Sequence, residues 1–505
     1  MNPLSFGIDF GTTNSMVAAW GSALITEGRP VAFWDTEKRP HPSVVWYGPH
    51  NSPIVGRAAR QNIGSHSTSM GHAFVSSVKR KLGSNAEIEL VGGQRKPAWE
   101  VASEIFKHLR DHAQHHQQMQ QAGKTMTECV VTVPVDFGGR QRSEIRRAMQ
   151  RAGLKLTTFL HEPFAAMVSH FYDPVKKLSS VAGKRTIVFD WGGGTLDICI
   201  TEVTADGSHV FEVSHDGIAD RAGDEFDIRV MHSLKQKFIR RSGLNIDDLP
   251  LRGNAPDRFR VAAENCKISL SSKMEERVEV PSLFEAFGKL TDLEEVLTRA
   301  EFEAVAQPEI DAAEACVQRC LNQARLTPGL IDYVLLVGGT SNIPAVRSMM
   351  EKIFGARVSV AHEPDAAIAR GAAIVAAEGW IPYNVKDVGV VLSDGTLFTV
   401  LSAGRPLLAS ESKKFSFYCV DPRDGVARIQ IAEHRNKGDS AISSLADCMT
   451  VKTNPKVREY RSLDRITAQF IVTEDATLRV VAQSAATGDK QEKDIHDLCF
   501  GLKLH

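Results

Sequence analysis

The pattern of apolar and polar positions divides the chain into two parts. Up to about Gly379, short apolar runs alternate with stretches in which apolar residues recur every three or four positions. This mixture is typical of the strands and helices of an α/β protein. From there to His505 the helical period disappears, and short segments of alternating residues are separated by turn residues such as Asp-Gly. The second pattern predicts a small antiparallel β domain.

Within the first part, one stretch predicts a hairpin with an unusual turn. In residues 187–200, IVFDWGGGTLDICI, an apolar run ends at Asp190, passes through three consecutive glycines and resumes as an alternating strand. Glycines lack a Cβ, so their backbone N–H groups can converge on an anion, while Asp190 and Asp197 offer oxygen ligands to a hard cation. The pattern suits a nucleotide phosphate with Mg²⁺, although a glycine-rich turn between strands is most often only a turn.

The hairpin pattern occurs twice, which indicates an internal duplication. Residues 5–20, SFGIDFGTTNSMVAAW, again place an aspartate, an aromatic residue and a glycine at the end of an apolar strand. The hexapeptides HEPFAA at 161–166 and HEPDAA at 362–367 form a second pair, and each leads into an alanine-rich helical segment. Two pairs in the same order argue against chance and predict two related α/β lobes that face one another.

A run of histidines lies on the predicted helix 99–122. His112, His115 and His116 raise the question of a metal site. Neither an HExxH motif nor a cysteine partner accompanies them, so a solvated polar helix face is the preferred interpretation.

Two other segments carry polar residues whose meaning is open from spacing alone. Residues 257–271 predict a helix with Glu264, Lys267 and Ser271 on one face, for which an exposed Glu–Lys pair is the simpler interpretation. Residues 331–348, IDYVLLVGGTSNIPAVRS, predict a buried strand, a double glycine and a helix that starts at a proline. The N–H groups at such a helix start suit phosphate or ribose oxygens, but a routine strand-to-helix loop has the same pattern.

Composition and charge narrow the class of protein. The 505 residues carry a net charge of -1 and are 43% hydrophobic, which suits a globular protein of about three domains and gives no reason to expect a nucleic-acid partner. The eight cysteines are scattered without CxxC pairs, which favours a reducing compartment. No apolar run approaches the roughly 18 residues that span a membrane, and no secretory leader is evident. We therefore expect a cytoplasmic protein that binds no membrane, with the overall look of a bacterial sequence.

The motifs resemble those of the DnaK-type (70-kDa) heat-shock chaperone family. The segments that carry this resemblance, in the family's order, are FGIDFGTTNS, TVPVDFGGRQR, HEPFAA, VFDWGGGTLDI, AAENCKISLSS, LLVGGTSNIP and EPDAAIARGAA. VKDVGVVL also resembles the family's interdomain linker, and residues 466–493 resemble the last strands of its β substrate-binding domain. The match covers essentially the whole chain, and its nucleotide motifs are more specific than its β-domain match.

The resemblance implies an α/β fold with a two-lobed actin-like (RNase H-like, duplicated) ATPase domain, followed by a small antiparallel β-sandwich domain without a helical lid. The implied boundaries are 1–384 for the ATPase domain (lobe I about 1–184 plus 362–384, lobe II about 185–361), 385–393 for the linker and 394–505 for the β sandwich.

The resemblance also implies the roles of individual residues around ATP or ADP and Mg²⁺. Lys79, in SVKRKLG, matches the family lysine that neutralises the γ-phosphate and positions water. The residues implied in catalysis are Lys79, Asp9, Glu162, Asp190, Asp197 and Thr195. Those implied in binding the nucleotide are Gly11, Thr12, Thr13, Asn14, Gly192, Gly193, Gly194, Thr195, Gly223, Asp224, Glu264, Lys267, Ser271, Gly338, Gly339, Asn342 and Asp365. Mg²⁺ would be ordered, largely through water, by Asp9, Asp190 and Asp197. Coupling between domains would pass through Pro134, Arg142, Asp387 and Val388.

Several positions depart from the family pattern. Asn342 stands where the family usually has an arginine that stacks on adenine, which predicts altered nucleotide affinity. Ala222 replaces the first of a glycine pair, and Trp191 stands in place of a small aliphatic residue. The family's helical lid and the acidic tail of some members are missing, so we expect a peptide bound to the β domain to leave fast.

The implied function is a slow, Mg²⁺-dependent ATPase and chaperone whose nucleotide state controls peptide or protein binding by the β domain. The alternative is an ATP-dependent regulatory or scaffold protein that switches a dedicated partner. The expected partners are unfolded or extended polypeptides or that dedicated protein, together with J-domain-type and nucleotide-exchange co-chaperones. A metabolite kinase is a weaker hypothesis because the linker and β tail have no role in it, and a P-loop ATPase is excluded because GxxxxGK[ST] is absent.

Overall fold

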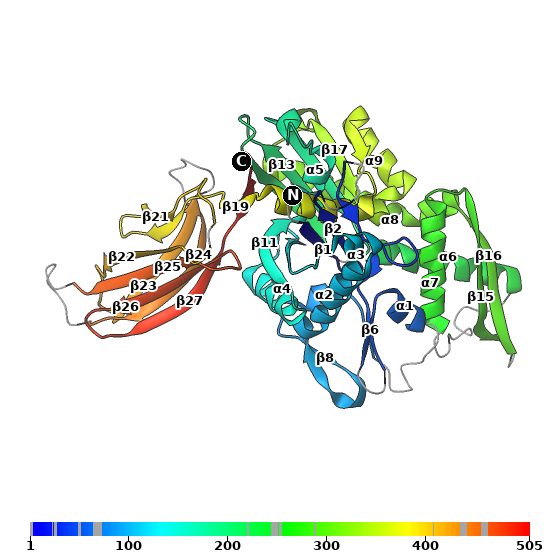
Figure 1. The fold of residues 1–505 in the computed structure, drawn as a ribbon, viewed down its shortest axis with the longest axis horizontal. Helices are drawn as coiled ribbons and strands as arrows, with labels where there is room; N and C mark the ends of the chain where they lie inside the picture. The colour runs from blue at the N-terminus through cyan, green and yellow to red at the C-terminus, as the bar shows by residue number, and fades with distance from the viewer. Residues whose placement is uncertain are drawn as a thin grey trace. The chain divides into compact units, whose positions relative to one another are not determined.

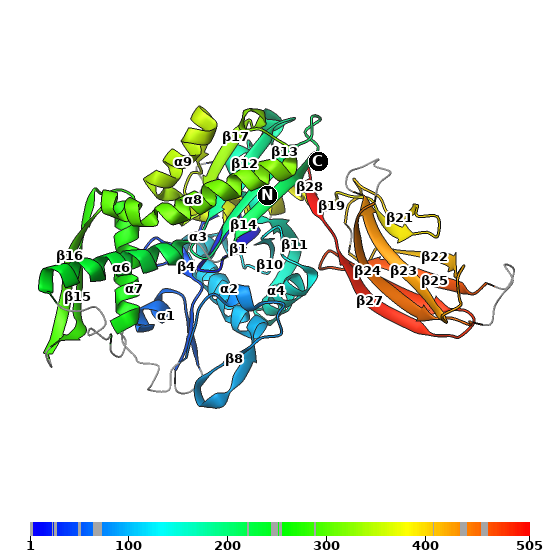
Figure 2. The same ribbon diagram turned by 180° about the vertical axis from the view of Figure 1, so that it is seen from behind.

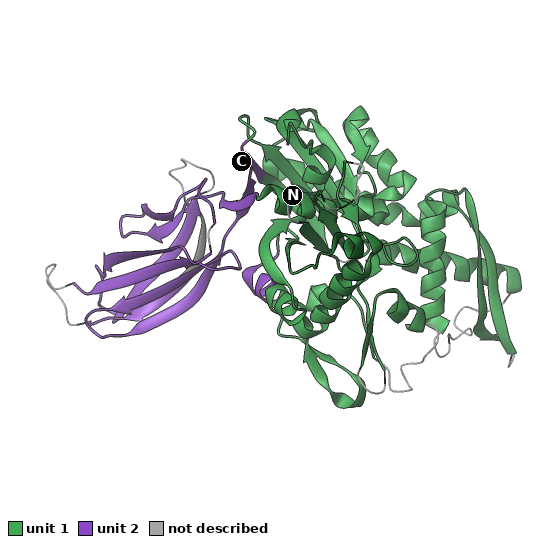
Figure 3. Cartoon of the chain, in the orientation of Figure 1, with its two compact units in different colours: residues 1–136, 144–207, 212–379 green, residues 137–143, 208–211, 380–505 purple. Residues whose placement is uncertain are grey.

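The structure is a computed structural model of the chain. The residues it describes are 4–22, 24, 28–48, 52–63, 73–219, 222–243, 251, 255–286, 289–407, 409–434, 442–455 and 463–504. They form two compact units, coloured separately in Figure 3. The first unit comprises 1–136, 144–207 and 212–379, and the second comprises 137–143, 208–211 and 380–505.

The two largest sheets of the first unit each include one of the duplicated hairpins. In lobe I the strand order is β11-β10-β1-β2-β3, with β1 parallel to β10 and antiparallel to β2. The strands of lobe I are β1 (Ser5–Phe10), β2 (Asn14–Trp20), β3 (Val31–Ala32), β4 (His41–Pro42), β10 (Glu128–Val133) and β11 (Lys155–His161). In lobe II the order is β18-β17-β12-β13-β14. The strands of lobe II are β12 (Arg185–Trp191), β13 (Leu196–Val203), β14 (His209–Ile218), β17 (Tyr333–Val337) and β18 (Val358–Val360).

The two HEPxAA segments begin equivalent helices. α5 (Glu162–Phe171) follows β11, α10 (Pro364–Glu378) follows β18, and each has a proline in its first turn. The helices approach so closely that a Cβ on Gly371 would overlap the backbone of Ala165. A Cβ on Gly7 of β1 would likewise overlap the backbone of α10. The repeated pattern in the sequence therefore corresponds to a repeated strand-hairpin-helix arrangement, held together at glycines.

The remaining helices of the first unit pack around its two largest sheets and extend lobe II (Figures 1 and 2). Figures 1 and 2 show α6 and α7 beside the hairpin β15–β16, and buried side chains from all four elements belong to one apolar core. The helices are α1 (Arg57–Ile63), α2 (Ala98–His115), α3 (Gln117–Ala122), α4 (Gly139–Arg151), α6 (Gly223–Ser242), α7 (Ala255–Leu270), α8 (Arg299–Ala324) and α9 (Pro344–Phe354). The hairpin strands are β15 (Glu275–Ala286) and β16 (Lys289–Thr298), and the short strands of lobe I are β5 (Val45–Tyr47), β6 (Pro53–Val55), β7 (Ala73–Val75), β8 (Glu87–Glu89) and β9 (Arg95–Pro97).

The second unit is built around a β sandwich, which confirms the predicted fold class. One sheet has the order β21-β20-β23-β24, the other β22-β25-β26-β27, and their inward-facing residues form a single core. The strands are β20 (Val388–Val391), β21 (Leu397–Leu401), β22 (Ser412–Tyr418), β23 (Val426–His434), β24 (Ile442–Lys452), β25 (Arg465–Val472), β26 (Thr477–Ser484) and β27 (Lys490–Asp497). Of the residues that the sequence assigns to the linker 385–393, β20 takes 388–391 and pairs with both β21 and β23.

A short strand from the end of the chain completes the second unit. β28 (Phe500–Lys503) pairs antiparallel with β19 (Ile381–Asn384) and, on its other edge, with His209 and Val210. A Cβ on Gly501 would overlap the ring of Tyr383. Glycine at this position therefore permits the close pairing.

The helical run predicted over 99–122 is interrupted. Its two helices, α2 and α3, meet at His116, whose backbone is extended at φ −65° and ψ 137°. The imidazole of His116 accepts a hydrogen bond from the N–H of Gln118 and so caps α3. His115 is exposed, as the predicted polar face requires, whereas Nε2 of His112 lies 2.8 Å from the carbonyl oxygen of Trp34.

A histidine pair, with His41 buried and His108 half-buried, lies between β4 and α2 of lobe I. Nδ1 of His41 lies 3.1 Å from Nε2 of His108, and Nε2 of His41 lies 2.9 Å from the carbonyl oxygen of Phe33. Burial lowers the pKa of both imidazoles to about 4, and the neighbouring His112 acts in the same direction. Both rings are therefore neutral in the folded protein at neutral pH.

This pair predicts a loss of stability in acid. The unfolded histidines bind protons below their ordinary pKa of about 6.5 and the folded ones only below about 4, so their contribution is complete above pH 6.5 and falls as the pH drops toward 4. The loss is on the order of 3 kcal/mol for each ring. In melting curves recorded from pH 7.5 to 4.5, the H41Q/H108Q variant should lose less stability than the wild type. H115Q, altered at an exposed site on the same helix, serves as the control, and a double variant with the wild-type pH dependence would contradict the assignment.

Candidate functional site

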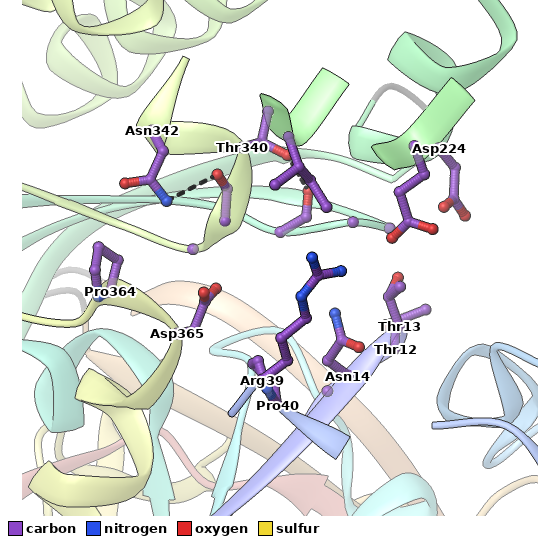
Figure 4. A pocket seen from close by; sticks show the side chains of 18 of the residues that line it. Thr12, Thr13, Asn14, Arg39, Pro40, Asp224, Thr340, Asn342, Pro364 and Asp365 are labelled. Atoms are coloured by element: carbon purple, nitrogen blue, oxygen red, sulfur yellow. Dashed lines mark hydrogen bonds between the residues drawn. The ribbon is translucent and has the colours of Figure 1, made fainter. Parts of the chain in front are cut away.

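A cavity of about 690 Å³ opens where the two duplicated hairpins meet in the first unit, and Figure 4 shows it from close by. Its lining comes from both sheets and from α1, α6 and α7. The predicted site residues that line it are Asp9, Gly11, Thr12, Thr13, Asn14, Lys79, Glu162, Asp190, Gly192, Gly193, Gly194, Thr195, Asp197, Asp224, Glu264, Lys267, Ser271, Gly338, Gly339, Asn342 and Asp365. Residues far apart in the sequence are therefore brought to one cavity.

The turns of the two hairpins touch, and only glycine permits the contact. A Cβ on Gly193 would overlap the side chain of Thr13, and a Cβ on Gly194 would press on Thr12. Oγ1 of Thr13 is buried and has no hydrogen-bond partner among the described residues. The close contact places backbone N–H groups and hydroxyls of both lobes around one small volume, a donor set that suits an anion.

Four carboxyl groups surround this contact: that of Glu162 is buried, and those of Asp9, Asp190 and Asp197 are half-buried. Asp190 and Asp197 are directly opposite one another on β12 and β13, and Asp9 is the last residue but one of the equivalent strand, β1, in lobe I. Burial and the charge of Glu162 raise the pKa of Asp9 to about 7 and that of Asp197 to about 6. The pKa of Asp190 is raised well above its ordinary value by burial and by the other three carboxylates. A hard cation with oxygen ligands would offset this concentration of negative charge.

Lys79 forms a buried ion pair beside the carboxyl groups. It lies on a short 3₁₀ turn, Val78–Lys81, which begins after Ser77 in the left-handed conformation. Nζ of Lys79 donates a hydrogen bond of 2.6 Å to Oε1 of Glu162. Burial opposes the charged ammonium, but Glu162 and Asp9 outweigh it and raise the pKa of Lys79. The side chain is therefore charged at neutral pH and is held beside the carboxylates.

The predicted nucleoside-binding face of α7 also reaches the cavity, with its charges already paired. Nζ of Lys267 lies 2.7 Å from Oδ1 of Asp227 and donates to the carbonyl of Gly223 at 2.9 Å. Glu264 forms an ion pair with Arg60 of α1, from the opposite lobe. The simpler interpretation of the spacing, an exposed pair between Glu264 and Lys267, is therefore wrong. Each side chain pairs with a residue of another helix instead.

Gly223 differs from the other predicted nucleotide-binding residues, because it is absent from the lining of the cavity. Its N–H donates to the carbonyl of Gly192 and that of Asp224 donates to the carbonyl of Gly193. The start of α6 thus supports the glycine turn from behind. Ala222, which departs from the family's glycine pair, is buried just before this helix.

The strand-to-helix loop after β17 closes the other side of the cavity. Gly338 has a φ of 79°, and a Cβ there would overlap Oδ1 of Asp190. Nδ2 of Asn342 donates to the carbonyl of Gly339 at 3.1 Å, a bond drawn in Figure 4. The amide of Asn342 is therefore part of the loop and offers no flat cationic surface to a base.

The indole of Trp191 lies behind the glycine turn. It is fully buried in the lobe II core and packs against Phe189 and Phe226, with ring centroids 5.7 and 5.2 Å away. The aromatic residue at this position thus fills the space between β12 and α6.

Sequence reasoning missed several residues of the cavity. Thr340 donates from its hydroxyl to the carbonyl of Gly192 at 2.9 Å, and its place directly after the double glycine was a usable signal. Arg39, Arg57 and Arg60 also line the cavity. Nothing in their local pattern marks them, because only the tertiary structure brings their segments to the hairpins.

The predicted coupling residues are distributed between the two units. In the first unit, Pro134 lines a small cavity of about 50 Å³ together with Glu162, Asp190 and Asp197. In the second unit, Arg142 donates to the carbonyls of Asp475, Ala476 and Phe137. Oδ1 of Asp387 accepts the N–H of Ala403, and Val388 begins β20.

Comparison with known families identifies the arrangement. The family model described as Hsp70 protein matches residues 5–497. The match includes both hairpins, the four carboxyl groups, Lys79 and almost all of the β sandwich. Within the part of the chain that the structure describes, no helix is long and apolar enough to cross a membrane. The chain therefore belongs to the Hsp70 (70-kDa heat-shock, DnaK-type) family of chaperone ATPases.

Proposed function

We propose that the chain binds ATP with Mg²⁺ in the cavity between the hairpins, hydrolyses it slowly, and uses the nucleotide state to control binding of extended polypeptide by its β sandwich. The observation that carries the proposal is the glycine contact between the two hairpins, with carboxyl groups and the Lys79–Glu162 pair beside it. Family members bind ATP or ADP with Mg²⁺ and act on unfolded polypeptides with co-chaperones. We extend those properties to this chain as proposals.

The residues around the cavity fit a nucleotide and its metal. Oγ1 of Thr13 is buried without a partner among the described residues and so is ready to donate to a phosphate oxygen. Because Gly193 and Gly194 lack a Cβ, Thr12 and Thr13 lie directly against them, and the backbone N–H groups of the two turns stay close enough to bind one anion. Asp9, Asp190 and Asp197 would hold Mg²⁺, largely through water, because their raised pKa values mark a site that lacks positive charge. When bound, Mg²⁺ supplies charge neutralisation at the phosphate oxygens.

The residues of the chain contribute position and charge to the reaction. Hydrolysis of ATP needs little covalent chemistry from a protein, because charge on the transferring phosphoryl group must be stabilised and a water must be aligned with it. Lys79 carries its positive charge on Nζ, and Glu162 fixes the direction of that ammonium. Asp197, with a pKa of about 6, is mainly ionised at neutral pH and suited to accept a hydrogen bond from water.

The proposed coupling between nucleotide and β sandwich begins at α4, which contributes residues to both units. Arg142, on this helix, is 2% exposed, and its guanidinium is held by three carbonyl oxygens. Pro134 lies on the segment that precedes the helix and lines a cavity together with Glu162. We therefore propose that a movement of Glu162 displaces Pro134, and that residues 134–142 carry this displacement to Arg142.

The proposed compartment is the cytoplasm. All eight cysteines are free thiols, five of them buried. Free thiols in this number suit a reducing environment.

Replacement of Lys79 should separate catalysis from binding. In K79A the ammonium that stabilises the transferring phosphoryl group is lost, so turnover should fall by roughly 10²-fold or more, with a much smaller change in ATP affinity. The measurement is single-turnover hydrolysis alongside calorimetric binding. K81A, an exposed lysine on the same 3₁₀ turn, provides the matched control. Turnover in K79A equal to that of the wild type, or a wild type that does not hydrolyse ATP at all, would contradict the proposal.

Removal of one site carboxylate should stabilise the nucleotide-free protein and weaken its binding of Mg²⁺ with ATP. The folded pKa of Asp9 is about 7 against an ordinary 3.8, so this group lowers stability increasingly as the pH rises from about 4 to about 7. D9N should therefore melt about 2 °C or more above the wild type at pH 8 without nucleotide, and the difference should shrink at pH 5. The same variant should lose most of the stabilisation that Mg²⁺ with ATP gives the wild type. D311N, which alters an exposed aspartate on α8, is the control. A D9N variant less stable than the wild type at pH 8 would contradict the assignment of a destabilising charge to Asp9.

Unfolded peptides of unrelated sequence should raise the ATPase rate if the β sandwich acts as a general chaperone domain. R142A should keep basal turnover within about threefold of the wild type and lose most of this stimulation, because the guanidinium no longer bridges the three carbonyls. R147A, an exposed arginine on the same helix, should retain it. No stimulation by any unrelated peptide would contradict the general chaperone, and a response to one protein alone would favour a dedicated partner.

A further inference from the structure

Five positively charged side chains line the described part of the cavity, and four of them are already paired. Lys79 is bound to Glu162, and Lys267 to Asp227. Arg57 contacts Asp35 through Nε and Nη2, each at 2.8 Å, and Arg60 is paired with Glu264. The fifth is Arg39, whose guanidinium has no hydrogen bond or ion pair with any described residue.

The backbone of Arg39 is held in place by a built turn. Oδ1 of Asp35 accepts the N–H groups of Glu37 and Arg39, at 2.8 and 3.0 Å, and the N–H of Asp35 donates back to the carbonyl of Arg39 at 2.9 Å. Arg57 anchors the other carboxylate oxygen, and the side chain of Asp35 is almost fully buried. The turn therefore fixes where the side chain of Arg39 starts.

The side chain points into the cavity. In the view of Figure 4 its guanidinium extends from the lobe I side of the cavity toward the lobe II side, and Asn14 and Thr13 line the same cavity. Thr13 is also the residue with a buried hydroxyl that lacks a described partner. Two donors from different segments, neither with a described side-chain partner, thus belong to the lining of the same cavity.

The chemistry of arginine favours a phosphate there. A guanidinium stays charged at all relevant pH values and presents a planar set of N–H donors that matches two oxygens of one phosphate. The alternative is a solvated arginine at the mouth of the cavity, which would contribute little to binding. The anchored turn and the direction of the side chain favour the first reading.

We propose that Arg39 is the phosphate-recognition cation of the cavity, and that it makes the chain prefer nucleotides to nucleosides. This inference rests on the proposed function, because it names a further residue of the same site. The other four cations of the cavity already face carboxylates. Arg39 would therefore neutralise negative charge on the bound phosphate that those four do not. The residue positions the phosphate chain and takes no part in proton transfer.

The test compares binding of ATP, ADP and adenosine to the full chain, with Mg²⁺ present, by titration calorimetry. R39Q should weaken ATP and ADP binding roughly tenfold, as expected for one charge-assisted hydrogen bond, and leave adenosine binding unchanged. R39K keeps the charge without the planar fork and should fall between R39Q and the wild type. K38Q makes the same change of net charge one residue away, outside the lining of the cavity, and should match the wild type.

The outcomes separate this inference from the function on which it rests. If the wild type binds no ATP, both fail. If the wild type binds ATP and R39Q binds it within twofold as tightly, only the role of Arg39 is overturned. An equal loss for adenosine would show that the substitution disturbs the turn rather than a phosphate contact, and would also overturn the inference. Melting curves of each variant verify that it folds.

Discussion

The close contact between the two hairpin turns is the constraint on which the site depends. The turns come together only because Gly193 and Gly194 present no side chain to Thr12 and Thr13. This contact brings Asp9 of one lobe and Asp190 of the other to the same place, beside Lys79 and Glu162. A methyl group at either glycine would push the lobes apart and separate the donors of one hairpin from the carboxylates of the other.

Repulsion between the carboxylates of the site lowers the stability of the nucleotide-free protein. Burying several carboxylates together raises their pKa values, and the single ammonium of Lys79 cannot compensate all of them. Proteins commonly carry such unfavourable charge at binding sites. A ligand of opposite charge binds more tightly there, because it relieves the repulsion between the carboxylates. The other four cations that line the cavity form ion pairs within its walls. The guanidinium of Arg39 has no hydrogen bond or ion pair with any described residue.

The segment that the resemblance assigns to the linker forms part of the β sandwich in the second unit. The apolar residues 388–391 form an interior strand of the sandwich, and Lys386, just before them, pairs with the buried Glu433 at 2.6 Å. Arg142 is held in the same unit by carbonyl oxygens, which a guanidinium satisfies several at a time. The residues that the resemblance assigns to coupling thus have definite partners, and whether those partners change with nucleotide is the substance of the proposed function.

The duplicated hairpins, the helices at HEPFAA and HEPDAA, the β sandwich and the family could all be predicted from the amino-acid order, because strand and helix periods, glycine turns and ordered motifs are local properties of the chain. The other features could not be predicted in this way. They are the break in the helix at His116, the pairing of Lys267 with Asp227, and the position of Gly223 behind the glycine turn. The arrival of Arg39, Arg57 and Arg60 at the cavity is a further one. These outcomes depend on which side chains meet across the fold, and such partners lie too far apart in the chain for any local pattern to record.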